Sequence, residues 1–291
     1  MEALFHETIS SSTIILFAAL GGLFTSLAGK INIGLEGLML ISAFLTPFFS
    51  QLTGNLFLGL MLSIILCATL GAFTYMLHSR YKANIFVVGL AMNLFAAGLT
   101  TFLSSVLLDS KGTVYFTLTT KIRPFDLPLL SDIPLVGILF SHQNAFDYLS
   151  FVLVIVIYFM LEKTFYGLRL KTVGFSHRTA ESAGIPVKAY SYSAFILSGI
   201  FCALSGAALA LPLESFVGNM TNGRGWIALV AVILGKNNPI GVLAAALIFG
   251  FSSTLANLLQ INTAIPPKLL MTIPFLMTLL ALIVYSAREK E

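Results

Sequence analysis

Long apolar runs separated by short polar connectors occupy most of the chain and predict membrane-spanning helices. A helix needs about 20 apolar residues to cross the ~30 Å hydrocarbon core of a bilayer, and most of these runs approach that length. We expect spans at residues 12–28, 33–49, 56–77, 85–108, 148–161, 191–211, 242–259 and 269–285. The predicted fold class is an all-α, polytopic transmembrane helical bundle, built as a single domain over residues 1–291.

One further apolar run, residues 226–234, is too short to cross the membrane as a helix and predicts a re-entrant or broken segment. It follows Gly223-Arg-Gly225, whose glycines permit an irregular backbone. If this run crosses the membrane, the chain has about nine spans and an external N-terminus. If it is re-entrant, the count falls to about eight, so the sequence leaves the topology open.

The composition excludes a soluble protein. Hydrophobic residues make up 57% and charged residues 10% of the chain, with a mean hydropathy of +0.95, whereas about a quarter of the residues in soluble domains are charged. The net charge of +4 resides mainly in connectors, so it indicates membrane orientation rather than nucleic-acid binding.

No catalytic chemistry is predicted. Cys67 and Cys202 lie in separate apolar runs and the histidines are scattered, so neither a metal spacing nor a catalytic constellation emerges. The phosphate-binding pattern Gly-x-x-x-x-Gly-Lys-Ser/Thr is absent from the sequence. We therefore expect no catalytic residue, no metal and no cofactor in this chain.

Residues 163–189 form the most polar and basic stretch between predicted spans, with five Lys or Arg residues. Basic connectors concentrate on the cytoplasmic side, so we place this loop there. Ser176 is suited to cap a short helix that Gly184 and Pro186 would end. Such a helix either docks a partner at the membrane surface or belongs to a simple charged connector, and physics alone favours neither.

Residues 109–147 form the longest polar connector. They show no basic excess and are predicted to lie outside, where they carry a short surface helix or contact an external partner.

Three stretches of the sequence resemble a known family. Residues 166–174, Tyr-Gly-Leu-Arg-Leu-Lys-Thr-Val-Gly, and 180–186, Ala-Glu-Ser-Ala-Gly-Ile-Pro, resemble the coupling loop of bacterial ABC importer permeases. The similar branch serves simple sugars, branched-chain amino acids and nucleosides. Residues 30–41 and 234–242 add family-like stretches in the right order, and the similarity covers roughly residues 12–286.

The resemblance implies a transport subunit without enzymatic activity, in the bacterial cytoplasmic membrane. A separate ABC ATP-binding subunit would hold ATP and Mg²⁺ and drive alternating access. The other implied partners are a longer homologous permease or a second copy, a substrate-binding lipoprotein outside, and membrane lipid, but no nucleic acid. The similar branch favours a nucleoside as substrate, with a simple sugar or riboflavin next. The expected ATPase-coupling residues are Ser176, His177, Arg178, Ala180, Glu181, Ala183, Gly184 and Ile185.

A cluster of polar residues and glycines begins the second predicted span. An ionised Glu36 facing lipid would cost a few kcal/mol, so we expect it to face protein or water. The alternatives are a structural or gating role, a direct substrate contact, or a position near the membrane interface beside Lys30. Asn93 is expected to bond across helices or to line the pathway. The predicted pathway or gating residues are Asn32, Gly34, Glu36, Gly37 and Asn93.

Two rival functions remain at this point. An ion-coupled secondary transporter would need no ATPase, but acidic residues within the spans are nearly absent beyond Glu36. A membrane scaffold without transport activity is opposed, more weakly, by the glycine-rich segments.

Overall fold

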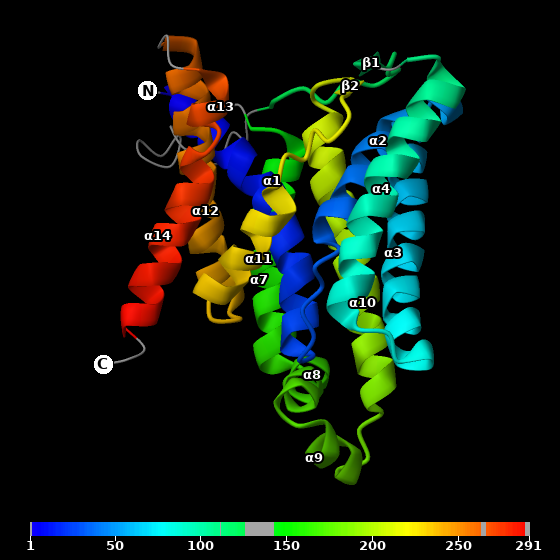
Figure 1. Cartoon of the computed structure of the whole chain (residues 1–291), viewed down its shortest axis with the longest axis vertical. Coiled ribbons are helices and arrows are strands. Elements are labelled where there is room, and N and C mark those ends of the chain that lie inside the picture. The colour runs from blue at the N-terminus through cyan, green and yellow to red at the C-terminus, as the bar shows by residue number, and fades with distance from the viewer. Residues whose placement is uncertain (1, 111, 126–142, 263–265, 289–291) are drawn as a thin grey trace.

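The computed structural model describes residues 2–110, 112–125, 143–262 and 266–288, and these form a bundle of long helices (Figure 1). The all-α transmembrane class is thereby confirmed. The helices are α1 (Glu2–Leu27), α2 (Leu35–Thr53), α3 (Leu56–Tyr81), α4 (Ile85–Leu108), α7 (Ala145–Lys163), α8 (Phe165–Phe175), α9 (His177–Ser182), α10 (Val187–Ala210), α11 (Arg224–Leu234), α12 (Pro239–Asn262), α13 (Pro267–Leu270) and α14 (Ile273–Arg288).

Within the described residues, seven helices are long and apolar enough to cross a membrane: α1, α2, α3, α4, α7, α10 and α12. Two shorter apolar helices, α11 and α14, accompany them. The total is close to the predicted eight or nine spans. The predicted short segment is α11, whose 11 residues span about 16 Å at 1.5 Å per residue, roughly half of the hydrocarbon core.

Helices α1, α2 and α10 form the centre of the bundle. In the most apolar 18-residue stretch of these helices, 89%, 72% and 72% of the residues are buried, whereas in α3 and α4 only 22% are buried. The small side chains of α10 between Ser198 and Ala207 are buried. Small residues let helix backbones approach closely, which stabilises helix packing where the solvent is lipid.

Two helix boundaries differ from the sequence prediction. Helix α1 begins at Glu2, well before residue 12, and within this extension the hydroxyls of Thr8 and Ser12 donate to the carbonyls of Leu4 and Thr8 at 2.7 and 2.6 Å. Polar residues that bond to the helix itself can extend it beyond its apolar run. The last predicted span is divided into α13 and α14, with Pro274 in the first turn of α14, where proline is favoured.

A small antiparallel pairing joins the external connector to the loop after α10. Strand β1 (Val114–Tyr115) pairs with β2 (Ser215–Phe216), at the end of the bundle opposite α8 and α9 (Figure 1). Lys121 strengthens this contact through an ion pair with Glu214 at 2.8 Å. Residues 126–142 of the connector lie outside the described residues, and the predicted surface helix or partner contact falls largely on them.

Candidate translocation and coupling site

The connection between α1 and α2 is an extended segment that returns into the bundle. Helix α1 ends in a Schellman-type cap, in which Gly29 has a φ of 74° and Lys30 N donates to Thr25 O at 2.9 Å. The segment then runs back alongside α1, and α2 begins about midway between the two ends of the bundle (Figure 1). A helix that starts at this depth places exposed backbone groups inside the protein, and these need partners.

Asn32 fixes the middle of this segment. Its Oδ1 accepts from Gly34 N at 3.0 Å, and its Nδ2 donates to Ser198 Oγ of α10 at 3.0 Å. Asn32 is 1% exposed, so both contacts form away from water. The residue therefore secures the backbone and has no free face toward a pathway.

Asn93 of α4 holds the same segment from the other side. Its Nδ2 donates to Ile33 O at 3.0 Å, and its Oδ1 accepts from Gly37 N at 2.8 Å. The predicted bonding across helices is confirmed, and it is directed to backbone groups at the start of α2.

Glu36 joins the first turn of α2 to the start of α11. Its Oε1 accepts from Gly223 N at 2.8 Å and its Oε2 from Gly225 N at 2.6 Å. Gly223, the N-cap residue of α11, has no side chain to cap that helix, so the Glu36 carboxylate supplies the acceptors. A negative group at a helix N-terminus is favoured by the helix dipole. Glu36 is 9% exposed and Lys30 contacts His177, so Glu36 neither pairs with Lys30 nor stays solvated.

The two helix starts border an open cavity of about 440 Å³. Small-molecule sites typically measure about 300–1,000 Å³. Its walls are mostly apolar and aromatic, with amide side chains from α4 and from the loop before α11. The lining residues are Glu36, Gly37, Leu40, Leu90, Asn93, Leu94, Ala97, Asn219, Asn222, Gly223, Trp226 and Phe275.

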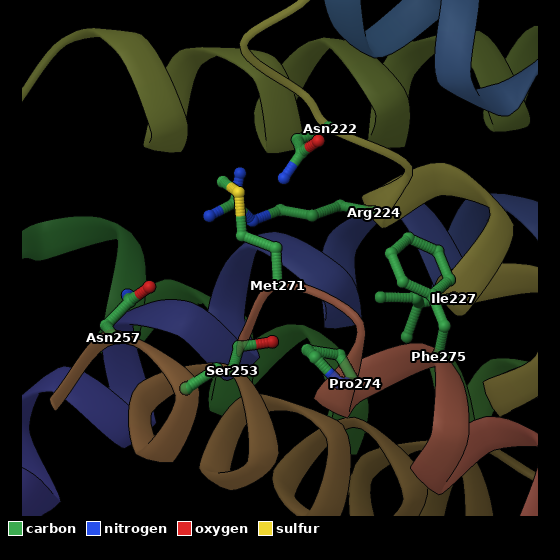
Figure 2. A pocket seen from close by; sticks show the side chains of 9 residues that line it. Asn222, Arg224, Ile227, Ser253, Asn257, Met271, Pro274 and Phe275 are labelled. Carbon is green, nitrogen blue, oxygen red and sulfur yellow. The ribbon is translucent and has the colours of Figure 1, made fainter. Parts of the chain in front are cut away.

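A second pocket adjoins this cavity, with Asn222 and Phe275 on the shared wall (Figure 2). It measures only about 60 Å³, enough for a few water molecules. Arg224 reaches into it, and its Nη1 donates to Met220 O at 3.1 Å. The guanidinium therefore stabilises the loop before α11.

The predicted coupling loop forms α8 and α9 at one end of the bundle (Figure 1). Ser176 caps α9 as predicted, with its Oγ accepting from Thr179 N at 3.3 Å. Among the other predicted coupling residues, Ala180 is fully buried against Val173 and Val187. Ile185 is half-buried, while the residues exposed to solvent are His177, Arg178, Glu181, Ala183 and Gly184.

Helices α8 and α9 contact the start of the returning segment directly. Gly174 of α8 packs so closely on Gly29 that a Cβ on Gly29 would lie 3.0 Å from Gly174 O. Lys30 Nζ lies 2.7 Å from His177 Nε2, and His177 Nδ1 lies 2.8 Å from Val173 O. Burial lowers the pKa of the Lys30 ammonium. Helices α8 and α9, the predicted coupling loop, are therefore linked to the cavity through residues 29–36.

The sequence singled out Asn32, Glu36 and Asn93, but it did not indicate that Asn219, Trp226 and Phe275 line the cavity. Trp226 begins the apolar run that is too short to cross the membrane, and this place was the signal that the sequence offered. The structure shows that the run is α11. Phe275 is one of 25 phenylalanines, and nothing in the sequence distinguishes it.

A solved structure shares this fold. An inward-facing conformation of a putative metal-chelate type ABC transporter superposes with a TM-score of 0.52 over 98% of this chain and 85% of that chain. The identity is 16%, so this likeness concerns the fold alone.

Several relatives align over nearly the whole chain. The nucleoside ABC transporter permease NupC of Lactococcus lactis is 34% identical over 95% of this chain and 90% of its own. The guanosine ABC transporter permease NupQ of Bacillus subtilis is 34% identical, over 97% and 91%. The putative glucose ABC transporter permease TsgC13 of Haloferax volcanii is 32% identical, over 99% and 92%.

The model of one protein family matches residues 4–282, almost the whole chain. Its description is branched-chain amino acid transport system, permease component. With the membrane-spanning helices and the relatives above, this match shows that the chain belongs to that family of ABC transport permeases.

Proposed function

We propose that the chain is the shorter permease subunit of an ATP-driven importer that carries nucleosides across the bacterial cytoplasmic membrane. The choice of substrate rests on one observation: the chain is 34% identical, over nearly its full length, to permeases for nucleosides and guanosine. The cavity suits a neutral, partly aromatic solute, because its walls are apolar and its only described acidic side chain, Glu36, is engaged by backbone.

A longer permease is proposed as the second membrane subunit. This chain covers 91% of NupQ, but 76% of the guanosine transporter permease NupP of the same bacterium. It therefore matches NupQ over more of its length than NupP, and both are guanosine transporter permeases. We propose that ATP and Mg²⁺ bind to a separate ATPase and that a lipoprotein delivers the substrate from outside.

In this proposal, residues 29–36 connect ATP hydrolysis to the cavity. When the ATPases move α9, the Gly29–Gly174 contact and the Lys30–His177 contact shift the start of the returning segment. Asn93 and Glu36 then transmit the shift to α4 and α11, whose side chains line the cavity. Both walls of the cavity would change together, as alternating access requires.

Uptake by the reconstituted importer tests the proposal. Proteoliposomes containing both permeases, the ATPase and the binding protein should accumulate labelled guanosine only with ATP. Excess unlabelled guanosine should compete, whereas glucose and riboflavin should not. The control is an ATPase whose P-loop lysine is replaced. Uptake driven by an ion gradient without the ATPase would overturn the importer assignment, and competition by glucose alone would overturn the nucleoside assignment.

The ATPase contact can be tested at Phe175, which is 93% exposed at the end of α8. A large exposed aromatic side chain directly before α9, which carries the exposed Arg178 and Glu181, fits a surface that a partner covers. Phe175→Ala should reduce co-purification of the ATPase, while Tyr115→Ala, 80% exposed at the opposite end, should not. Equal recovery with both variants would show that Phe175 does not contribute to docking. Ala180 is less suitable because it is buried within the loop.

A further inference from the structure

Two amide side chains in the cavity are free to bind a solute. Glu36 and Asn93 are engaged by backbone groups, as described above. Asn219 and Asn222 are exposed, and neither side chain forms a hydrogen bond with the described part of the chain. Each amide offers donors and an acceptor in one plane.

The loop that carries these amides is held in place by its own turns and by Glu36. Asn219 and Asn222 have φ values of 60° and 46°, a conformation that asparagine tolerates better than most residues. Asn222 N donates to Asn219 O at 3.1 Å, and the next residue, Gly223, donates to Glu36. The backbone that carries the amides is therefore fixed before a ligand arrives, which lowers the entropic cost of binding.

Aromatic rings lie beside the amides. Trp226, the only tryptophan of the chain, is in the first turn of α11 and is 40% exposed. Phe275 of α14 is 42% exposed and packs on Gly223, where an added Cβ would lie 2.7 Å from its Cζ. Phe275 and Asn222 both lie on the wall seen in Figure 2.

We propose that Trp226, Asn219 and Asn222 recognise the base of the transported nucleoside. Aromatic side chains that stack on a base, together with amides that bond to its edge, are the means by which proteins bind unpaired bases. The ring of Trp226 would stack on the base, and the two amides would bond to its polar edge. This inference rests on the proposed nucleoside function and assigns base recognition to named residues of that site.

Tryptophan fluorescence gives a direct readout of this site. The complex of both permeases and the ATPase, in nanodiscs without the binding protein, is titrated with guanosine and separately with ribose. The difference in emission between wild type and Trp226→Phe isolates the signal of Trp226 from that of other subunits. Guanosine should change this signal saturably, and ribose should not.

The amides are removed by the double substitution Asn219→Gly/Asn222→Gly, because glycine accepts a positive φ without strain. Loss of the amides should weaken guanosine binding about tenfold or more, comparable to a lost stacking or bidentate contact. The matched control is Val217→Ala, since Val217 is 43% exposed on the same loop and does not line the cavity. Size-exclusion profiles check that each complex remains assembled.

The outcomes separate this inference from the proposed function. An equal response to ribose, or unchanged guanosine affinity in the double variant, overturns base recognition by these residues. Base recognition is also overturned if the fluorescence of Trp226 does not change on guanosine addition, although the same complex imports guanosine when the binding protein is present. If the complete wild-type importer takes up no guanosine, the proposed function fails and base recognition fails with it.

Discussion

At the scale of single residues, Glu36 shows how an acidic side chain is accommodated within the bundle. Burying a carboxylate is costly unless hydrogen bonds compensate. Here both oxygens accept backbone N–H groups at the start of α11, where the helix dipole also favours negative charge. The sequence predicted that Glu36 would face protein. It did not predict the partners Gly223 and Gly225, because hydrophobic patterns do not say which helix ends meet.

Replacing Glu36 by glutamine should destabilise the protein. The amide retains one acceptor, but its NH₂ group faces a backbone N–H, so one buried donor loses its partner. Such a loss costs about 1–3 kcal/mol. We expect Glu36→Gln to lower the thermal unfolding midpoint of the purified protein, whereas Glu7→Gln, at an exposed position of α1, should leave it unchanged.

A second substitution tests the same contact from the other helix. A Cβ on Gly225 would lie 2.6 Å from Glu36 N, so Gly225→Ala should push α11 away from α2 and also lower the midpoint. Gly218→Ala is the control, because no atom lies within 4 Å of the added Cβ. If Glu36→Gln and Gly225→Ala both unfold like wild type, the contact of Glu36 with the start of α11 does not stabilise the protein.

At the scale of elements, apolar run length predicted most of the helices because crossing lipid requires a long, continuous apolar segment. Helix boundaries were less accurate where polar side chains bond within a helix, as Ser12 does in α1. The sequence also marked α9 through Ser176 and Gly184, which have local capping roles. Contacts between distant elements, such as Gly29 with Gly174, leave no local pattern and could not be predicted.

The contact between α8 and the end of α1 should be required for coupling. A Cβ on Gly174 would overlap Leu27 O, so Gly174→Ala must displace α8 from the start of the returning segment. We expect this variant to retain basal ATP hydrolysis. The number of nucleoside molecules taken up per ATP hydrolysed should fall several-fold. The measurement is the ratio of both rates in proteoliposomes.

Gly98→Ala is the matched control for Gly174→Ala. Gly98 also lies in a helix, and no atom lies within 4 Å of its added Cβ. Its ratio of uptake to ATP hydrolysis should equal that of wild type. A normal ratio for Gly174→Ala would exclude this contact as a coupling element and would leave Lys30–His177 as the remaining link between α9 and the returning segment.

At the scale of the whole molecule, the exposed side of the cavity fits the proposed second permease. Its rim includes Leu90 and Leu94 of α4, which are 51% and 71% exposed. The exposed amides of Asn219 and Asn222 cannot face hydrocarbon without a large cost, since lipid offers no hydrogen bonds. A second permease that covers this rim would close the pathway and remove that cost.

Photocrosslinking provides a test of this arrangement. With benzoylphenylalanine at position 94, irradiation of the assembled importer should give an adduct that contains both permeases. At Ile155 of α7, which is 57% exposed and does not line the cavity, the same probe should give no such adduct. The expectation follows because the amides of Asn219 and Asn222 in the cavity must be kept from lipid by protein, whereas an apolar helix face is stable against lipid. Crosslinks to the second permease from position 155 but not from position 94 would place the subunit interface on the other face and leave the cavity outside the pathway between the permeases.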